Sequence, residues 1–254
     1  MRLEDYANRY QNIRLERHAD GVLEMTLHTR GGEALWGSSP EGLHNELGLA
    51  FADLARDPAN KVLLLTGTGR TFIAAMDRGM RAPEPGLAEM WRRIYGEGVA
   101  LLENLLAVPV PVIAAVNGPA LIHAEIAALS DIVLAAEHAE FADLAHVPNG
   151  VVPGDGVHTV WPLLLGPNRG RYFLLTGERI GAADAQRLGV VAEVLPAERL
   201  LPRARELAGR LAQLDDQVLR HTRTLLVRQL RRRMQDELGF GLALEALATW
   251  RGSP

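Results

Sequence analysis

The sequence contains no cysteine, which excludes disulfide bonds, thiolate nucleophiles and metal sites built on cysteine. It also has no long apolar run: VLLLTG and VPVPVIAAV are of strand length, far short of the roughly 20 residues of a membrane span. The N-terminus mixes charges of both signs and shows no apolar secretory segment. We therefore expect a cytoplasmic protein that does not act at a membrane.

A strong charge of one sign is missing as well. The formal net charge is −4, with 27 basic and 31 acidic residues, so nucleic acid is not an expected partner. Hydrophobic residues make up 48% of the 254, which is typical of a globular protein that buries a large core. The length predicts one domain with an appendage.

Cofactor and metal motifs are absent too. The glycine-rich stretches GTGR and GVVPGDG match neither GxxxxGK[ST] nor GxGxxG, which disfavours a phosphate-binding loop. The eight histidines show no HExxH spacing on a helix. We expect no cofactor and no metal.

Strands and helices alternate along most of the chain. NIRLERHADGVLEMTLHT predicts two strands joined by a turn at Asp20-Gly21. The next predicted elements are helices over 40–57, 90–106 and 123–129, strands over 62–66, 110–116, 132–135 and 190–194, and two short helices before the last strand. This alternation indicates an α/β fold with crossover connections. From about residue 196 to 250 the pattern is helical.

Three blocks resemble the crotonase, or enoyl-CoA hydratase/isomerase, superfamily. They are VLLLTGTGRTFIAAMD (62–77), PVIAAVNGPALIHAEIAALSDIVLAAEHAEFAD (111–143) and the stretch from VVPGDGVHTVW to VAEVLP (151–196). The resemblance implies an α/β spiral of ββα repeats over residues 1–195. It also implies a helical C-terminal region over 196–254 that joins subunits into a homotrimer or a dimer of trimers.

Two departures from the family pattern bear on function. Family members form an oxyanion hole for a coenzyme A (CoA) thioester from backbone N–H groups, at a small-Gly-x-Asp element and at a run of three glycines. This chain has AAMD and LIHAE at those places. One hydratase glutamate matches Glu125, whereas His146 stands where the other is expected. The resemblance therefore does not imply hydration by two carboxylates.

Both departures resemble the β-diketone hydrolase branch of the superfamily, which is typified by 6-oxocamphor hydrolase. NIRLER, LTGTG, GVVPGDG, NRGRYFLLTG and GLALEAL support this. The resemblance implies hydrolysis of a carbon–carbon bond in a cyclic 1,3-diketone with a bicyclic ring system. This retro-Claisen reaction gives a keto acid. It implies His146 as the base, Asp155 as its orienting acid, His123 as a further catalytic residue, and Trp36 and Glu245 as substrate-binding residues.

These residue types suit the reaction. A neutral imidazole accepts a proton from water near neutral pH, and a carboxylate on its other nitrogen stabilises the imidazolium. The leaving group is an enolate, whose oxygen needs hydrogen-bond donors such as His123 and the indole of Trp36. From the residues alone, His123 is interpreted as structural and His146 as a surface-loop residue. Asp155, ahead of an apolar helix, is also a candidate helix N-cap.

Two other functions stay open. The first is an acyl-CoA hydratase or isomerase that works through Glu125. The second is a non-enzymatic trimeric binding module, whose arginine-rich tail (Arg220, Arg223, Arg228 and 231–233) meets acidic partners. Those arginines also fit a solvated or subunit-bridging helix face. The diketone ring system and the product stereochemistry depend on pocket residues, among them the segment from Met76 to Trp91.

Overall fold

The computed structural model describes residues 1–79 and 86–250. Its main sheet has the strand order β1-β2-β4-β6-β7-β10. These strands are β1 (Ile13–Arg17), β2 (Val22–Leu27), β4 (Val62–Gly67), β6 (Val112–Val116), β7 (Ile132–Ala136) and β10 (Glu193–Leu195). Only β1 is antiparallel to its neighbour, as expected for the predicted hairpin, and the other pairs are parallel.

Short strands lie beyond the ends of the main ones: β3 (Leu35–Trp36), β5 (Ala75–Met76), β8 (Glu140–Phe141) and β9 (Ile180–Gly181). β3 pairs with β5 and β8 with β9, and Ala120 bridges Ile73 to Phe141 between the two pairs. A long strand, a short extended segment and then a helix therefore recur along the chain. This is the predicted α/β spiral of ββα repeats.

Ten helical segments complete the described residues. The α-helices are α1 (Leu43–Ala55), α2 (Leu87–Ala107), α3 (Glu125–Ala128), α4 (Val157–Leu165), α5 (Pro167–Thr176), α6 (Ala182–Arg187), α7 (Ala197–Ala212) and α8 (Asp216–Thr249). The 3-10 helices are η1 (Leu3–Asp5) and η2 (Val147–Asn149). None of the described helices is long and apolar enough to cross a membrane.

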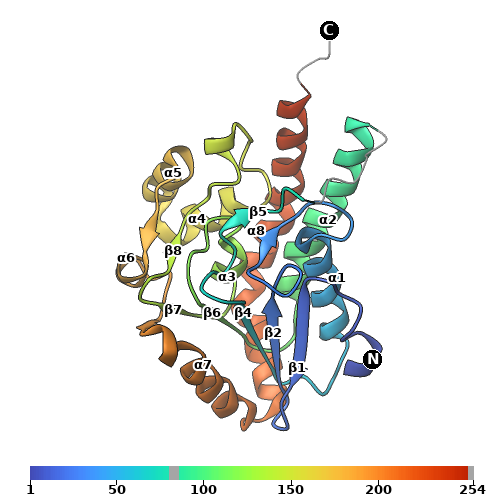
Figure 1. Ribbon diagram of the computed structural model, residues 1–254, viewed down its shortest axis with the longest axis vertical. Coiled ribbons are helices and arrows are strands. Elements are labelled where there is room, and N and C mark those ends of the chain that lie inside the picture. The colour runs from blue at the N-terminus through green and yellow to red at the C-terminus, as the bar shows by residue number, and fades with distance from the viewer. Residues whose placement is uncertain (80–85, 251–254) are drawn as a thin grey trace.

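The sheet is buried on both faces, which is why its parallel strands are continuous apolar runs. On one face, side chains such as Leu64 and Ile113 pack against the buried alanines of α7. On the other face, residues such as Leu63 and Leu65 join the larger core with α1 and α2. In Figure 1, α7 lies on the opposite side of the sheet from the α1 and α2 pair.

Most predicted elements are confirmed, but the strand predicted over 190–194 begins at Glu193. Val190 and Val191 instead donate their backbone N–H groups to the carbonyl of Ala185, at 2.9 and 3.2 Å, and so close the end of α6. The predicted C-terminal region divides into α7 and α8, and the side chain of Asp215 caps α8 by accepting from the N–H of Val218. Residues 80–85 of the segment Met76 to Trp91, and residues 251–254, lie outside the described residues.

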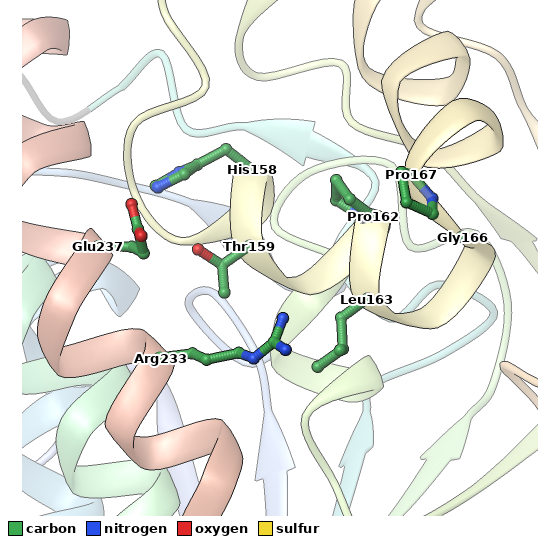
Figure 2. A pocket seen from close by; sticks show the side chains of 8 residues that line it. All are labelled: His158, Thr159, Pro162, Leu163, Gly166, Pro167, Arg233 and Glu237. Carbon is green, nitrogen blue, oxygen red and sulfur yellow. The ribbon is translucent and has the colours of Figure 1, made fainter.

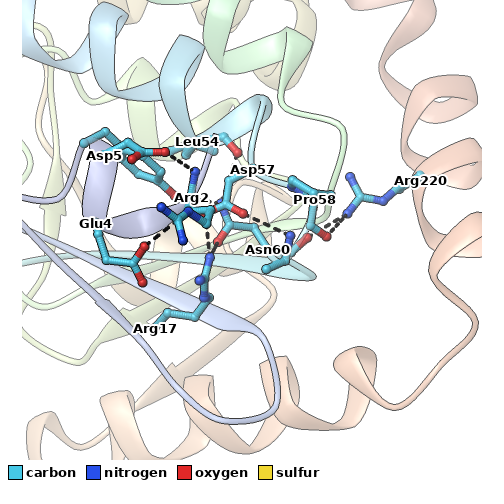
Figure 3. A network of polar contacts seen from close by, with 11 residues as sticks. Arg2, Glu4, Asp5, Arg17, Leu54, Asp57, Pro58, Asn60 and Arg220 are labelled. Atoms are coloured by element: carbon cyan, nitrogen blue, oxygen red, sulfur yellow. Dashed lines mark hydrogen bonds and ion pairs between the residues drawn. The ribbon is translucent and has the colours of Figure 1, made fainter.

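Two arginines of α8 bind within the chain. Arg220 donates to the carbonyl of Asn60 at 2.8 Å, beside the polar cluster in which Arg17 binds Asp57 (Figure 3). Arg223 is 2% exposed and pairs with Asp131. Part of the arginine-rich tail therefore anchors α8 to the core.

Candidate active site

The five predicted site residues surround one cavity of about 150 Å³. Trp36 ends the short strand β3, which follows β2, whereas His123 lies in the loop after β6 and His146 in the loop after β8, so the segments after the strands bring all three to the carboxyl side of the main sheet. Asp155 precedes α4, and Glu245 projects from α8. The cavity is lined by Trp36, Ser38, His44, Met76, Trp91, Ile94, His123, Ala145, His146, Val151, Asp155, Leu242 and Glu245.

Asp155 bridges the two histidines of the cavity. Its Oδ2 lies 3.2 Å from Nε2 of His146 and 3.0 Å from Nδ1 of His123. The contact predicted between Asp155 and His146 is therefore present, but the same oxygen also serves a second ring. The N-cap interpretation of Asp155 is wrong: Gly156, at φ 97°, is the N-cap of α4, and no side chain caps it.

The other nitrogen of His146 belongs to a residue that the sequence did not single out. Nδ1 of His146 donates to Oδ1 of Asp143 at 2.7 Å, and the exposed fraction of Asp143 is 1%. Asp143 precedes His146 by three residues, so its signal was a D-x-x-H spacing on the loop after β8. The orienting position on Nδ1 belongs to Asp143, and both nitrogens of His146 face carboxylates.

Glu125 likewise has a partner in the cluster. Its Oε1 lies 2.8 Å from Nδ1 of His123, and its exposed fraction is 1%. The sequence left Glu125 without a role. Because Glu125 and Asp155 share one nitrogen of His123, only Nε2 of that ring is left for a ligand.

His123 has a backbone conformation that suits glycine. Its φ is 52°, in the left-handed region that costs a residue with a side chain roughly 1–2 kcal/mol. Its position falls within the three-glycine run of the family. The backbone therefore keeps a conformation typical of glycine at a residue that carries an imidazole. Such backbone strain is typical of functional positions.

The backbone N–H groups just before His123 already have acceptors within the chain. The N–H groups of Leu121 and Ile122 both donate to the carbonyl of Ile73, at 2.9 and 3.2 Å. Both side chains are buried. A hydrogen bond to a ligand oxygen on this side of the cavity is therefore best supplied by Nε2 of His123.

The carboxylates favour the charged form of both rings. Burial acts to lower the pKa of His123, but Asp155 and Glu125 raise it to about 10. Burial also opposes the charged form of His146, yet Asp155 and Asp143 hold its pKa well above the ordinary value. Conversely, the pKa of Asp155 stays well below its ordinary value, against burial, because both rings face it. At neutral pH one carboxylate thus joins two imidazolium rings.

Two acids of the site behave differently. Burial raises the pKa of Glu125, with Asp155 and Asp143 adding to the effect against His123. Burial and the charge of Asp155 raise the pKa of Glu245 to about 7, against the attraction of the two rings. Glu245 therefore changes its charge near neutral pH.

Aromatic groups form the wall beside His123. Trp36 stacks on His123 with ring centroids 3.9 Å apart and an interplanar angle of 28°. An indole face attracts a cation, so this stacking also favours the charged ring. Trp36 also contacts His44 in an edge-to-face arrangement, with ring centroids 5.6 Å apart, and Nδ1 of His44 lies 3.0 Å from Oε2 of Glu97. His44 is a cavity residue that no sequence motif indicated.

Helix α8 is held directly against the turn that carries Asp155. A side chain at Gly154 would collide with the carbonyl oxygen of Gly241 in α8, and one at Gly241 would collide with that of Gly154. The two backbones thus touch where only glycine fits. Because Glu245 is one turn beyond Gly241, this contact fixes it relative to Asp155.

Three of these side chains could hold a metal ion. One ligand atom from each of His123, His146 and Asp155 lies within 4.8 Å of the others. The pairing of Asp143 with His146 resembles the carboxylate that often supports a histidine ligand. The same atoms also suit an ion-paired proton network, so the absence of a metal remains a prediction.

A larger groove of about 590 Å³ lies between α4 and α8, outside this cluster (Figure 2). His158, Thr159 and Leu163 of α4 line it, opposite Arg233 and Glu237 of α8. His158 donates from Nδ1 to the carbonyl of Pro153 at 3.0 Å. The linked acids and imidazoles lie in the smaller cavity, which is therefore the candidate active site.

Comparisons with known proteins agree with this fold. The enoyl-CoA hydratase/isomerase family model matches residues 17–245. The chain therefore belongs to this family, the crotonase superfamily, as predicted.

Among curated relatives, a crotonyl-CoA hydratase of Syntrophomonas wolfei is 37% identical over 158 residues, which cover 61% of this chain and 59% of the relative. A carnitinyl-CoA dehydratase of Salmonella arizonae is 34% identical over 205 residues, which cover 80% of this chain and 75% of the relative. Among solved structures, a β-diketone hydrolase of the cyanobacterium Anabaena sp. PCC 7120, bound to (S)-3-oxocyclohexyl acetic acid, is 42% identical. Its TM-score is 0.90, and the match covers 96% of each chain.

Proposed function

We propose that this protein hydrolyses a carbon–carbon bond of a cyclic 1,3-diketone with a bicyclic ring system and releases a keto acid. The observation that carries the proposal is the Asp155 bridge between His123 and His146 in a small cavity with apolar walls. His123 provides a donor at the place where thioester enzymes of the family use a backbone N–H group. The Anabaena hydrolase supports the proposal, because its bound molecule is a cyclic ketone with an acetic acid side chain.

The reaction places two demands on the site. Water must attack one carbonyl carbon, and the electrons of the broken bond must move onto the other carbonyl oxygen. His123 and Trp36 are proposed to hydrogen-bond that second oxygen, and one such donor typically lowers the barrier by about 3–4 kcal/mol. His146 and Asp155 are proposed to act on the water and on the proton that returns to the enolate carbon.

The positive charge of His146 limits how His146 and Asp155 can act on the water. A ring whose pKa is raised holds both protons at neutral pH, so it donates readily and accepts poorly. The role of His146 as the acceptor of the water proton, which the family resemblance implies, requires its minor neutral form. The charged ring is the resting form, and its two N–H groups are bound to Asp143 and Asp155.

Turnover of a diketone panel tests the proposal. The purified protein is incubated with 6-oxocamphor and with simple cyclic 1,3-diketones, and loss of the diketone absorbance is followed together with a product heavier by one water. His146→Ala should abolish the rate, whereas His221→Ala, at an exposed histidine of α8, should match the wild type. No turnover across the panel would refute the proposed reaction.

The curated relatives favour a second candidate, an acyl-CoA hydratase or isomerase. Such an enzyme needs Glu125 as a free acid or base, and Glu125 is bound to His123. Calorimetry with crotonyl-CoA separates the two candidates. Micromolar binding would favour the thioester class, and no binding is expected from the diketone hydrolase.

We also propose the homotrimer, alone or as a pair of trimers, that the family resemblance implies. Five apolar side chains of α8 are more than half exposed and are available for burial between subunits: Val218, Leu225, Leu226, Phe240 and Leu247. Light scattering on the purified protein measures the assembly. A monomer would contradict this proposal and would leave the diketone assay unaffected.

A further inference from the structure

Hydrolysis of a diketone needs hydrogen-bond donors for two oxygens, and this inference rests on the proposed function. His123 and Trp36 are proposed to serve the second carbonyl oxygen, which becomes the enolate. The first carbonyl oxygen, on the carbon that water attacks, takes the negative charge of the tetrahedral intermediate and also needs a donor. We propose that the indole N–H of Trp91 in α2 is the donor to this first oxygen.

The nearest groups that could stabilise this oxygen are already bound within the chain. The backbone N–H groups of Leu121 and Ile122 donate to the carbonyl of Ile73. Both ring nitrogens of His146 face carboxylates. An oxyanion on the attacked carbon therefore needs a donor from another wall of the cavity.

Trp91 carries a donor that has no acceptor. This residue lines the cavity and is 8% exposed. Among the described residues that line the cavity, Nε1 of Trp91 is the one side-chain nitrogen that is buried without a hydrogen-bond partner. An indole N–H can only donate, and a buried one usually has an acceptor. An oxygen of a bound substrate would supply the acceptor that is missing.

Two other cavity residues, His44 and Ser38, are weaker candidates for this role. Nδ1 of His44 lies 3.0 Å from Oε2 of Glu97, so the neutral ring donates there and leaves Nε2 as an acceptor. Ser38 is exposed, so its hydroxyl exchanges a bond to water for a bond to the substrate and gains little. The buried N–H of Trp91 gains a full hydrogen bond.

The helix that carries Trp91 turns one face to the cavity. Trp91 and Ile94, three residues apart on α2, both line it. Gly98 follows on the same face, and a Cβ there would lie 3.4 Å from Leu242 and 3.5 Å from Nε2 of His44, which also line the cavity. Close packing at Gly98 thus holds this face of α2, and Trp91 with it, against the cavity.

A missing acceptor is not sufficient by itself, as Trp161 shows. Nε1 of Trp161 is also buried without a partner among the described residues. Trp161 is fully buried, however, and packs against Phe173 with ring centroids 4.4 Å apart, away from the residues that line the cavity. A ligand in the cavity does not meet this ring, so Trp161 is the matched control for Trp91.

The steps balance without an oxidant or reductant. Water bonds to the first carbonyl carbon, the π electrons of that carbonyl move onto its oxygen, and the Trp91 N–H donates a hydrogen bond to this oxyanion. The carbonyl then re-forms, the carbon–carbon bond breaks, and its electron pair moves onto the second carbonyl oxygen as an enolate. The proton lost by water returns to the enolate carbon by way of His146 and Asp155, as in the proposed function. The first oxygen ends in the carboxyl group of the keto acid.

Trp91→Phe keeps an aromatic ring in the cavity wall and removes the N–H. For a diketone that the wild type turns over, kcat should fall by about 10² to 10³-fold, as expected for loss of one oxyanion donor, with KM changed only a few-fold. The shape of the pH profile should stay that of the wild type, because the lost group does not titrate. Trp161→Phe should keep the wild-type kcat. Thermal melting verifies that each variant is folded.

Binding of two ketones separates a hydrogen bond from a change of cavity shape. (S)-3-oxocyclohexyl acetic acid, the molecule bound to the Anabaena hydrolase, has a carboxylate that corresponds to the first carbonyl, whereas cyclohexanone offers only a counterpart of the second. In magnetic resonance titrations, Trp91→Phe should raise Kd for the acid by about ten-fold or more, as expected for loss of a hydrogen bond to a charged group. Kd for cyclohexanone should not change.

The same titration of nitrogen-15-labelled wild type observes the donor directly. The indole N–H resonance of Trp91 is assigned by its absence from Trp91→Phe, and it should shift downfield when the acid binds. The resonance of Trp161, assigned in the same way, should stay in place. A purely structural role of Trp91 would not give this shift.

Three outcomes would overturn the inference, and they are distinguishable from one another. A folded Trp91→Phe variant that keeps the wild-type kcat and the wild-type Kd for the acid would overturn the assignment of Trp91 alone. Equal weakening of the acid and of cyclohexanone, with a Trp91 resonance that does not move, would show that the ring only shapes the cavity. A wild type that turns over no diketone would overturn the proposed function and this assignment together.

Discussion

Arg223 should be one of the strongest anchors of the fold. This arginine of α8 is 2% exposed and donates to four acceptors. Nε binds Oδ2 of Asp131 at 2.7 Å, and the terminal nitrogens bind the carbonyls of Leu105, Leu106 and Val108 at the end of α2. One side chain thus holds α8, the end of α2 and the approach to β7 together.

Arg223→Met keeps the length of the side chain and removes all four interactions. It leaves the Asp131 carboxylate, which is 16% exposed, with the backbone N–H of Val112 as its remaining donor among the described residues. Breaking a buried pair by removing one partner costs about 3–5 kcal/mol. In a chain of this size, 1 kcal/mol shifts Tm by roughly 2–4 °C, so we expect Tm to fall by about 10 °C.

Calorimetry at fixed protein concentration measures this, because assembly also affects Tm. Arg228→Met, at an exposed position of the same helix, should change the free energy of unfolding by less than about 0.5 kcal/mol. The variant Asp131→Asn and the double variant then give the coupling between the two residues. A Tm for Arg223→Met within 2 °C of the wild type would refute the reasoning.

Two further predictions concern the active site. Asp143→Asn should lower kcat for the diketone by about 10² to 10⁴-fold with little change in KM, because His146 loses the carboxylate that orients Nδ1; an unchanged kcat would show that the contact is only structural. At position 123, glycine and alanine both remove the imidazole, but only glycine suits a φ of 52° without strain, so His123→Gly should be more stable than His123→Ala by about 1 kcal/mol in urea unfolding. Equal stability of the two variants would mean that the backbone at position 123 relaxes to a conformation that suits alanine.

The sequence predicted the fold well for a physical reason. Buried parallel strands are continuous apolar runs, and a turn such as Asp20-Gly21 is local, so both leave a signal in neighbouring residues. The strand over 190–194 was misplaced because Val190 and Val191 are apolar enough for a strand. Their N–H groups are taken by the end of α6, which is a contact that hydrophobicity does not encode.

The site could be predicted only in part. Family motifs placed Trp36, His123, His146, Asp155 and Glu245 at one cavity. They did not indicate which carboxylate faces which ring nitrogen, because residues of different loops meet there at distances that chain spacing does not fix. Asp143 was therefore missed on Nδ1 of His146, and the bridge from Asp155 to His123 was not foreseen.

The contact between Gly154 and Gly241 has a consequence for how specificity can change. It leaves no room for a side chain between α8 and the Asp155 turn, so the acid-bearing half of the cavity cannot be widened by substitution there. Other parts of the cavity wall come from Met76 of β5 and from Trp91 and Ile94 of α2, where side chains line the cavity. New ring sizes should therefore be accepted through exchanges at Met76 and Ile94, with the chemistry left intact.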